Sequence, residues 1–111
     1  MVAAMAQSWI AEERVVFVDA DGNRTPGRIA IGIPEQLTEE ACCEIALEGM
    51  ERTHKIRGAS TLQALLLAIC LGGMRLRDFI AKGGRVIDPD EGNDVPLEAY
   101  FGALLRTTAT P

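Results

Sequence analysis

The chain has 111 residues, of which 48% are hydrophobic, 5% aromatic and 24% charged, and its formal net charge is -5 at neutral pH. A chain of this length has room for one core, so we expect residues 1–111 to form a single domain, with a core at about 12–105 and loose ends. The acidic balance and the scarcity of aromatic side chains argue against partners such as nucleic acid or an anionic membrane surface.

The cysteines and the lengths of the apolar segments indicate in which cellular compartment the protein is located. Cys42, Cys43 and Cys70 are an odd number, two of them adjacent, which favours reduced and buried thiols over disulfides. The N-terminal residues lack the basic leader of a signal peptide. The uncharged run 60–74 is shorter than the roughly 20 apolar residues of a membrane span. We therefore expect a cytoplasmic protein that does not bind membranes.

Alternating apolar residues predict strands in the first half of the chain, at 15–18, 28–33, 41–48 and 51–57. The Gly and Asn of the segment 19–23 suit a tight turn, so the first two strands form a hairpin. Gly49 turns the third strand into the fourth, whose many charges suit a sheet edge. The sequence therefore predicts an antiparallel sheet of about four strands, arranged as two hairpins.

A long helix follows this sheet. Ser60 and Gln63 have the spacing of a capping box, and the glycine pair at 83–84 offers a stop. At helical spacing, one apolar stripe is expected to lie on the sheet; it consists of Leu62, Leu65, Leu66, Ile69, Gly73, Leu76 and Ile80.

The last third of the chain completes the predicted architecture. Residues 85–87 are expected to be a short strand or an extended link. After a cap at Asn93 or Asp94, a short C-terminal helix is predicted from the helical spacing of Leu97, Tyr100, Phe101, Leu104 and Leu105. The predicted fold class is α+β, with an antiparallel sheet packed on one main helix and a short C-terminal helix.

The opposite side of the main helix is apolar in its first half and charged in its second half, where we expect it to emerge into water. In the first half it carries Ala64, Leu67, Ala68, Leu71 and Met74, and in the second half Arg75, Asp78 and Lys82. Exposure of the large members to water would forgo about 1.5 to 3 kcal/mol each. Either the C-terminal segment or the same helix of a second copy could cover this stripe, and the two are not exclusive. We take its five apolar residues as the candidate homodimer interface.

One segment carries a resemblance to a known family. The strand centred on Cys43, the charged strand after it and the sequence GASTLQALLLA at 58–68 resemble a family of small bacterial proteins classed as a domain of unknown function. The recurring motif of that family is approximately G-x-D/S-x-x-Q-A-L-x-L-A at the start of the main helix. The resemblance covers roughly residues 13–88, and Cys42 departs from the pattern. It implies the same fold and carries over no activity.

The residues that could carry chemistry form no recognisable catalytic pattern. His54 is the single histidine, and a zinc site shared with Cys42 and Cys43 is disfavoured because adjacent strand residues point to opposite faces. Cys70 has no charged neighbour that would stabilise a thiolate. The acidic segment 88–94 lacks the later bidentate Glu of a calcium loop. We therefore expect no catalytic residue, no cofactor and no metal.

Three classes of function remain open. The favoured class is a non-enzymatic, homodimeric interaction module that also offers an exposed edge or face to another protein. The second is a small-ligand binding protein with a pocket between sheet and helix. The third is an enzyme whose site would combine arginine, aspartate and His54 at a dimer interface.

Overall fold

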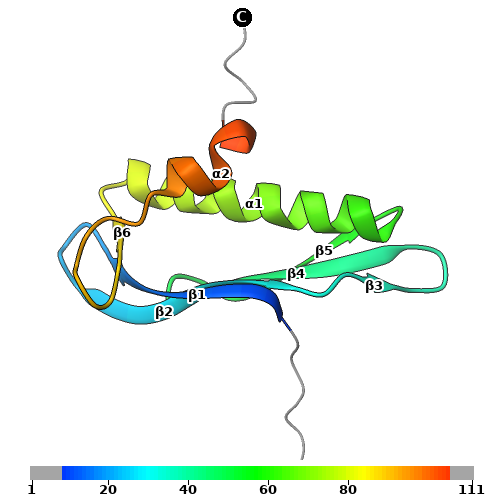
Figure 1. Cartoon of the computed structure of the whole chain (residues 1–111), viewed down its shortest axis with the longest axis horizontal. Coiled ribbons are helices and arrows are strands. Elements are labelled where there is room, and N and C mark those ends of the chain that lie inside the picture. The colour runs from blue at the N-terminus through cyan, green and yellow to red at the C-terminus, as the bar shows by residue number, and fades with distance from the viewer. Residues whose placement is uncertain (1–8, 106–111) are drawn as a thin grey trace, which may run out of the picture.

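The structure, a computed structural model, describes residues 9–105, and the surroundings of side chains as far as residue 102. One antiparallel sheet forms the lower layer of Figure 1, and two helices lie on one of its faces. The strands are β1 (Trp9–Val18), β2 (Arg24–Gly32), β3 (Glu35–Gln36), β4 (Ala41–Glu48), β5 (His54–Gly58) and β6 (Arg85–Ile87), and the helices are α1 (Thr61–Ala81) and α2 (Leu97–Leu105).

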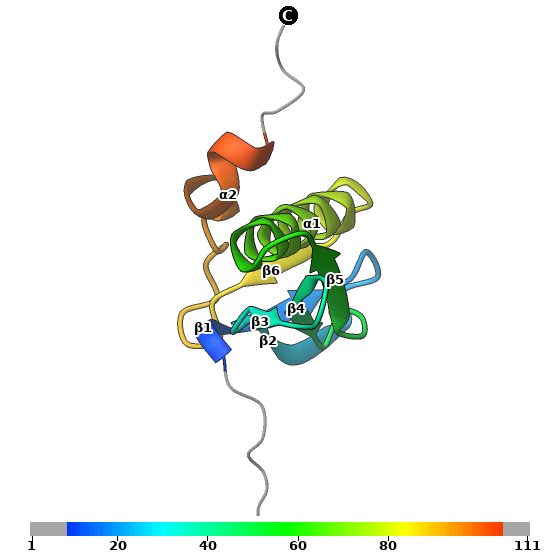
Figure 2. The same cartoon turned by 90° about the vertical axis from the view of Figure 1, so that its right-hand side faces the viewer.

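The order of the strands explains where α1 lies on the sheet. The sheet runs β3-β4-β2-β1-β6, and β5 also pairs with β4. β5 and β6 therefore lie toward opposite edges, and α1 is the segment that joins them; the helix packs mainly on β4 and β5 and meets β6 near its end (Figures 1 and 2). α2 lies beside α1, on the flank of its second half.

The predicted α+β class and both hairpins, β1 with β2 and β4 with β5, are confirmed, but the sheet has six strands. β6 forms at the segment 85–87, where a strand or a link was expected. β3 is only two residues long and has no alternation to reveal it. β1 begins at Trp9, well before the predicted start, because the polar residues 12–14 pair with β2 while remaining exposed.

Both ends of α1 form as the sequence predicts. The Ser60 hydroxyl accepts a hydrogen bond from the Gln63 backbone N–H at 3.1 Å, and the Gln63 side chain accepts one from the Ala59 N–H at 2.5 Å. Gly83 ends the helix with a φ of 100°, a conformation that glycine adopts without steric cost. The predicted cap of α2 is wrong, because Asp94 instead pairs with β6 and holds Arg85 at 3.0 Å.

Small residues form the surface of α1 that lies on the sheet. Ala64 and Ala68 are 0% exposed and pack on the apolar side chains of β4. A Cβ at Gly72 would lie 2.9 Å from Cδ1 of Ile45, and a Cβ at Gly58 would lie 2.7 Å from the Ala64 nitrogen. Ala64, Ala68 and Gly72 recur every fourth position, on one face of the helix, and Gly58 belongs to the strand that they approach. The backbone of α1 therefore lies unusually close to β4 and β5.

This packing corrects the predicted orientation of α1. Leu62, Leu66 and Ile80, expected on the sheet, are 63%, 49% and 43% exposed. Ala64 and Ala68, expected on the opposite side, are the residues that face the sheet. The helix is therefore rotated by roughly a quarter of a turn from the predicted phase. The reason is physical: small side chains permit closer approach than leucines, so the leucines turn outward.

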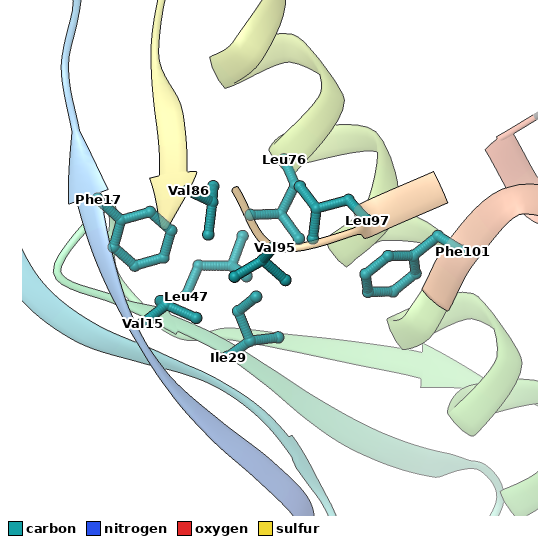
Figure 3. Close-up of a cluster of buried hydrophobic side chains, with 9 residues drawn as sticks. All are labelled: Val15, Phe17, Ile29, Leu47, Leu76, Val86, Val95, Leu97 and Phe101. Atoms are coloured by element: carbon teal, nitrogen blue, oxygen red, sulfur yellow. The ribbon is translucent and has the colours of Figure 1, made fainter. Parts of the chain in front are cut away.

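The main core joins both helices to the sheet, and Figure 3 shows its side chains converging between the two layers. It consists of Val15, Phe17, Ile29, Leu47, Leu76, Val86, Val95, Leu97 and Phe101. Leu97 and Phe101 anchor α2 beside Leu76 of α1. The C-terminal segment thus covers a flank of α1. The surroundings of Leu104 and Leu105, and the ends expected to be loose, lie outside the described residues.

We predict that Ala68→Leu lowers the free energy of unfolding by about 1 to 3 kcal/mol, because the larger side chain would force α1 away from β4. Ala81→Leu makes the same change at an exposed position of the same helix and should stay within about 0.5 kcal/mol of the wild type. Urea denaturation measures both. Equal effects of the two substitutions would contradict the close packing of α1.

Candidate functional site

The candidate site is the side of α1 that points away from the sheet. We call this surface the outer face; it comprises Gln63, Leu66, Leu67, Cys70, Leu71 and Met74. Leu66, Leu67 and Met74 are 49%, 43% and 56% exposed, whereas Cys70 and Leu71 are half-buried. No residue of α1 before Arg75 is charged. The outer face is therefore apolar and accessible over the first two thirds of the helix.

The size of this surface points to a partner. Together with Leu62 on its flank, the outer face exposes apolar area on the order of 400 Å², which matches the largest patch on a typical monomer. Patches of that size commonly mark interaction sites. As far as residue 102, the side chains of α2 pack on a different flank of α1, formed by Gly73, Leu76 and Ile80.

The predicted interface residues divide into two groups. Leu67 and Met74 are exposed on the outer face, and Leu71 lies at its edge, where it also packs against the core cluster of Ala64 and Ala68. Ala64 and Ala68 are buried against β4 and are out of reach of a second subunit. Leu66, predicted to lie on the sheet, belongs to the outer face instead. The signal in the sequence that indicates the observed orientation of α1 is the four-residue spacing of the small residues Ala64, Ala68 and Gly72.

The far face of the sheet, opposite the helices, has a different character. Arg28 lies at its centre and is bound by Glu12 at 2.5 Å and Glu48 at 3.0 Å, with its guanidinium 5.2 Å from the centre of the Trp9 ring. The neighbouring residue Ala30 is fully buried. Such paired charges are typical of a sheet face in contact with water. The centre of this face therefore carries an ion-paired arginine, unlike the uncharged outer face of α1.

A polar cluster ties the turn between β4 and β5 to α1. Glu51 receives two hydrogen bonds from the Nε of Arg75 at 3.1 and 3.2 Å and one from its terminal nitrogen at 2.7 Å. Nε2 of His54 lies 2.7 Å from the same carboxylate. Hydrogen bonding from Arg75, and secondarily from His54, lowers the pKa of Glu51. Arg75 was expected to point into water, and the sequence gives no sign of this long-range pairing.

The cluster brings together all three residue types that the enzyme hypothesis needs, as Arg75, Asp78 and His54. Arg75 and His54 both bind the Glu51 carboxylate, which is only 19% exposed. Arg75 additionally lies 3.9 Å from Asp78 of the next turn. With both carboxylate oxygens occupied, this arrangement holds the β4–β5 turn against α1.

A shallow depression of about 280 Å³ lies between the sheet and the helices. Its lining is mainly apolar and comprises Ala11, Glu12, Glu13, Ile29, Ile31, Ile69, Tyr100 and Phe101. At the rim, the Tyr100 hydroxyl donates to the Glu13 carboxylate at 2.9 Å, and this contact raises the pKa of Tyr100. The volume is at the lower end of ordinary ligand sites. It fits a compact apolar molecule.

The three thiols are free. Cys42 and Cys43 are buried, and burial raises the pKa of the Cys43 thiol, which makes it a poor nucleophile. Within residues 9–102, no group of three His, Cys, Asp or Glu side chains could hold a metal ion. In the described part of the chain, neither helix combines the length and hydropathy needed to cross a membrane.

Comparisons with known proteins identify no relative: the chain matches no protein family, no curated protein and no solved structure. The resemblance to a small bacterial family therefore stays a prediction carried by the motif at 58–68. The geometry of the chain itself is the basis for its functional interpretation.

We predict that Glu51→Gln destabilises the protein most near neutral pH and least in acid. Because the pKa of Glu51 is lowered in the folded state, its contribution is complete above its ordinary value of 4.5 and is lost as the pH falls through the folded-state pKa. The measurement is the free energy of unfolding of both proteins from pH 7 down to about pH 2, so that the folded-state pKa of Glu51, which lies below 4.5, is crossed. Glu39→Gln, at an exposed position, is the control and should show no such convergence. A constant difference for Glu51→Gln would contradict the assignment.

Proposed function

We propose that the protein is a non-enzymatic interaction module that forms a homodimer through the outer face of α1. The observation that carries this proposal is the exposure of Leu66, Leu67 and Met74 on one uncharged helix surface. The presence of three free thiols supports a reducing compartment, and we place the module in the cytoplasm.

The energetics favour association. Burial of apolar area on the order of 400 Å² from each subunit would contribute roughly 10 kcal/mol per subunit. Association costs about 4 to 15 kcal/mol in lost freedom of motion, before desolvation of polar groups at the edges. The remainder for two subunits, about 5 to 16 kcal/mol, spans the value of about 8 kcal/mol that a dimer at micromolar concentration requires.

The intramolecular pairing of the charged side chains also supports a binding role rather than a catalytic one. His54 and Arg75, two of the residues that an enzyme would need, both hold Glu51 in an intramolecular cluster. Arg28 is likewise held by Glu12 and Glu48 on the far face of the sheet. These charged residues form ion pairs within the chain and stabilise the scaffold. None of them lies on the outer face of α1, which is apolar.

Light scattering coupled to size exclusion tests the proposal. The wild type is expected to be a dimer at micromolar concentration, and Leu67→Lys should weaken the dimer at least roughly 30-fold, because a buried charge at an interface costs 2 kcal/mol or more. Ile10→Lys places the same charge on a half-exposed residue of β1 and should leave the dimer intact. A monomeric wild type, or equal weakening by both substitutions, would contradict the proposal.

A second candidate function rests on the depression beside α2. Its apolar floor and the Glu13 carboxylate at its rim suit a compact apolar molecule with one hydrogen-bond donor. Its small volume makes it the weaker candidate, since ligand sites commonly occupy about 300 to 1,000 Å³.

A fragment screen by two-dimensional NMR tests this second function. A ligand in the depression should shift the amide signals of Ala11 and Ile69, and Ile69→Trp, which fills the space, should abolish the shifts. Thr25→Trp, at an exposed position of β2, is the control and should preserve them. Shifts that persist in Ile69→Trp would place the ligand elsewhere, and the absence of any shift would count against a ligand-binding role.

A further inference from the structure

We infer that the two copies pair with their α1 helices antiparallel and with the two-fold axis beside Cys70. This inference rests on the proposed homodimer and adds its geometry. The outer face is a single stripe along one helix, and a symmetric dimer must place that stripe on its own copy. Two arrangements satisfy the symmetry, one with parallel helices and one with antiparallel helices.

The position of Cys70 on the outer face identifies the centre of the contact. Leu66 lies one helical turn before it and Met74 one turn after it, and these two are the large exposed side chains at either end of the stripe. An axis beside Cys70 places Leu66 against the partner's Met74 and Met74 against the partner's Leu66. Both ends of the stripe are then covered by apolar side chains.

The distribution of charge favours the antiparallel arrangement. The outer side of α1 is uncharged until Arg75, after which Arg77 and Asp78 follow. Parallel helices would place Arg77 beside the partner's Arg77 and would align the two helix dipoles. Antiparallel helices place Arg77 beside the partner's Gln63, an exposed polar residue, and oppose the dipoles. The outer face of α1 is thus complementary to the outer face of a second copy when the two helices are antiparallel.

The small size of Cys70 permits close contact at the axis. Packed helices lie about 8 to 10 Å apart, and their Cα atoms lie about 2.3 Å from each helix axis. Two facing Cα atoms are then separated by roughly 3.5 to 5.5 Å, which overlaps the separation of about 4.4 to 6.8 Å found in disulfides. The two Cys70 thiols would therefore lie within reach of each other.

The area agrees with a second copy as the occupant. A stable interface buries about 800 Å² per partner, of which somewhat more than half is apolar. The apolar area of the outer face, on the order of 400 Å², supplies most of that share. Gln63 and Arg77 at its ends would contribute to the polar rim.

Oxidative cross-linking tests this geometry on the full chain. Copper–phenanthroline in air catalyses the loss of two protons and two electrons from a pair of thiols to dissolved oxygen. The wild type is expected to double its mass of 12.0 kDa through a disulfide between the two Cys70 residues, mapped by peptide mass spectrometry. Cys42 and Cys43 are buried and should not react, and Cys70→Ser should remain uncross-linked.

Engineered cysteines in the Cys70→Ser background distinguish the two orientations. Leu66→Cys combined with Met74→Cys should restore the doubled mass, because each new cysteine then faces the other one in the partner. Leu66→Cys alone and Met74→Cys alone should stay at the monomer mass. Ile10→Cys in the same background controls for random collision and should also stay at the monomer mass. The doubled mass in both single variants would indicate parallel helices and overturn the inference.

Light scattering on the unoxidised proteins separates this inference from the proposed function. A dimer that forms no disulfide at Cys70, and none in the combined Leu66→Cys and Met74→Cys variant, overturns the antiparallel geometry and leaves the homodimer standing. A monomer overturns both.

Discussion

The structure depends on how closely α1 lies against β4. Ala64, Ala68 and Gly72 present almost no side chain to the sheet, so the helix backbone comes within contact of Ile45 and its neighbours. This close approach sets the rotation of the helix about its axis. The leucines and Met74 are then displaced to the opposite side. The apolar outer face is thus a consequence of the way the helix is seated.

Polar side chains hold this arrangement at two places. The Glu51 carboxylate binds both His54 and Arg75, which joins the β4–β5 turn to the middle of α1. Arg28 performs a similar role across β1, β2 and β4 on the far face. The Glu51 carboxylate is fully engaged within the chain, whereas Nε of Arg28 lies 3.0 Å from Glu48 without forming a hydrogen bond. The outer face of α1, by contrast, gathers the exposed side chains of Leu66, Leu67 and Met74 on one uncharged surface.

The sequence predicted those elements whose signals are local. β4 was found with its full length, and the ends of α1 followed from Ser60 and the glycines at 83–84. These signals arise from alternation and from capping chemistry, which depend on neighbours along the chain. β3 and the first half of β1 were missed because their pairing depends on distant strands and leaves no apolar alternation.

The candidate site was predicted only in part, for a related reason. A helix that is apolar all round does not reveal its orientation by hydrophobicity alone, and large side chains were taken to face the sheet. The deciding information was side-chain volume at Ala64, Ala68 and Gly72, read together with the apolar surface of β4. The cluster at Glu51 could not be predicted, because Arg75 meets it only after the chain has folded.

The most direct test of the account is the solvent exposure of individual methyl groups as the protein concentration rises. A soluble paramagnetic agent should broaden the methyl signals of Leu66 and Met74 in dilute solution and lose this effect in concentrated solution, while Leu76 is protected throughout. That result would show both the orientation of α1 and the burial of its outer face by a second copy. Protection of Leu66 and Met74 in the dilute monomer, or exposure of both at every concentration, would contradict it.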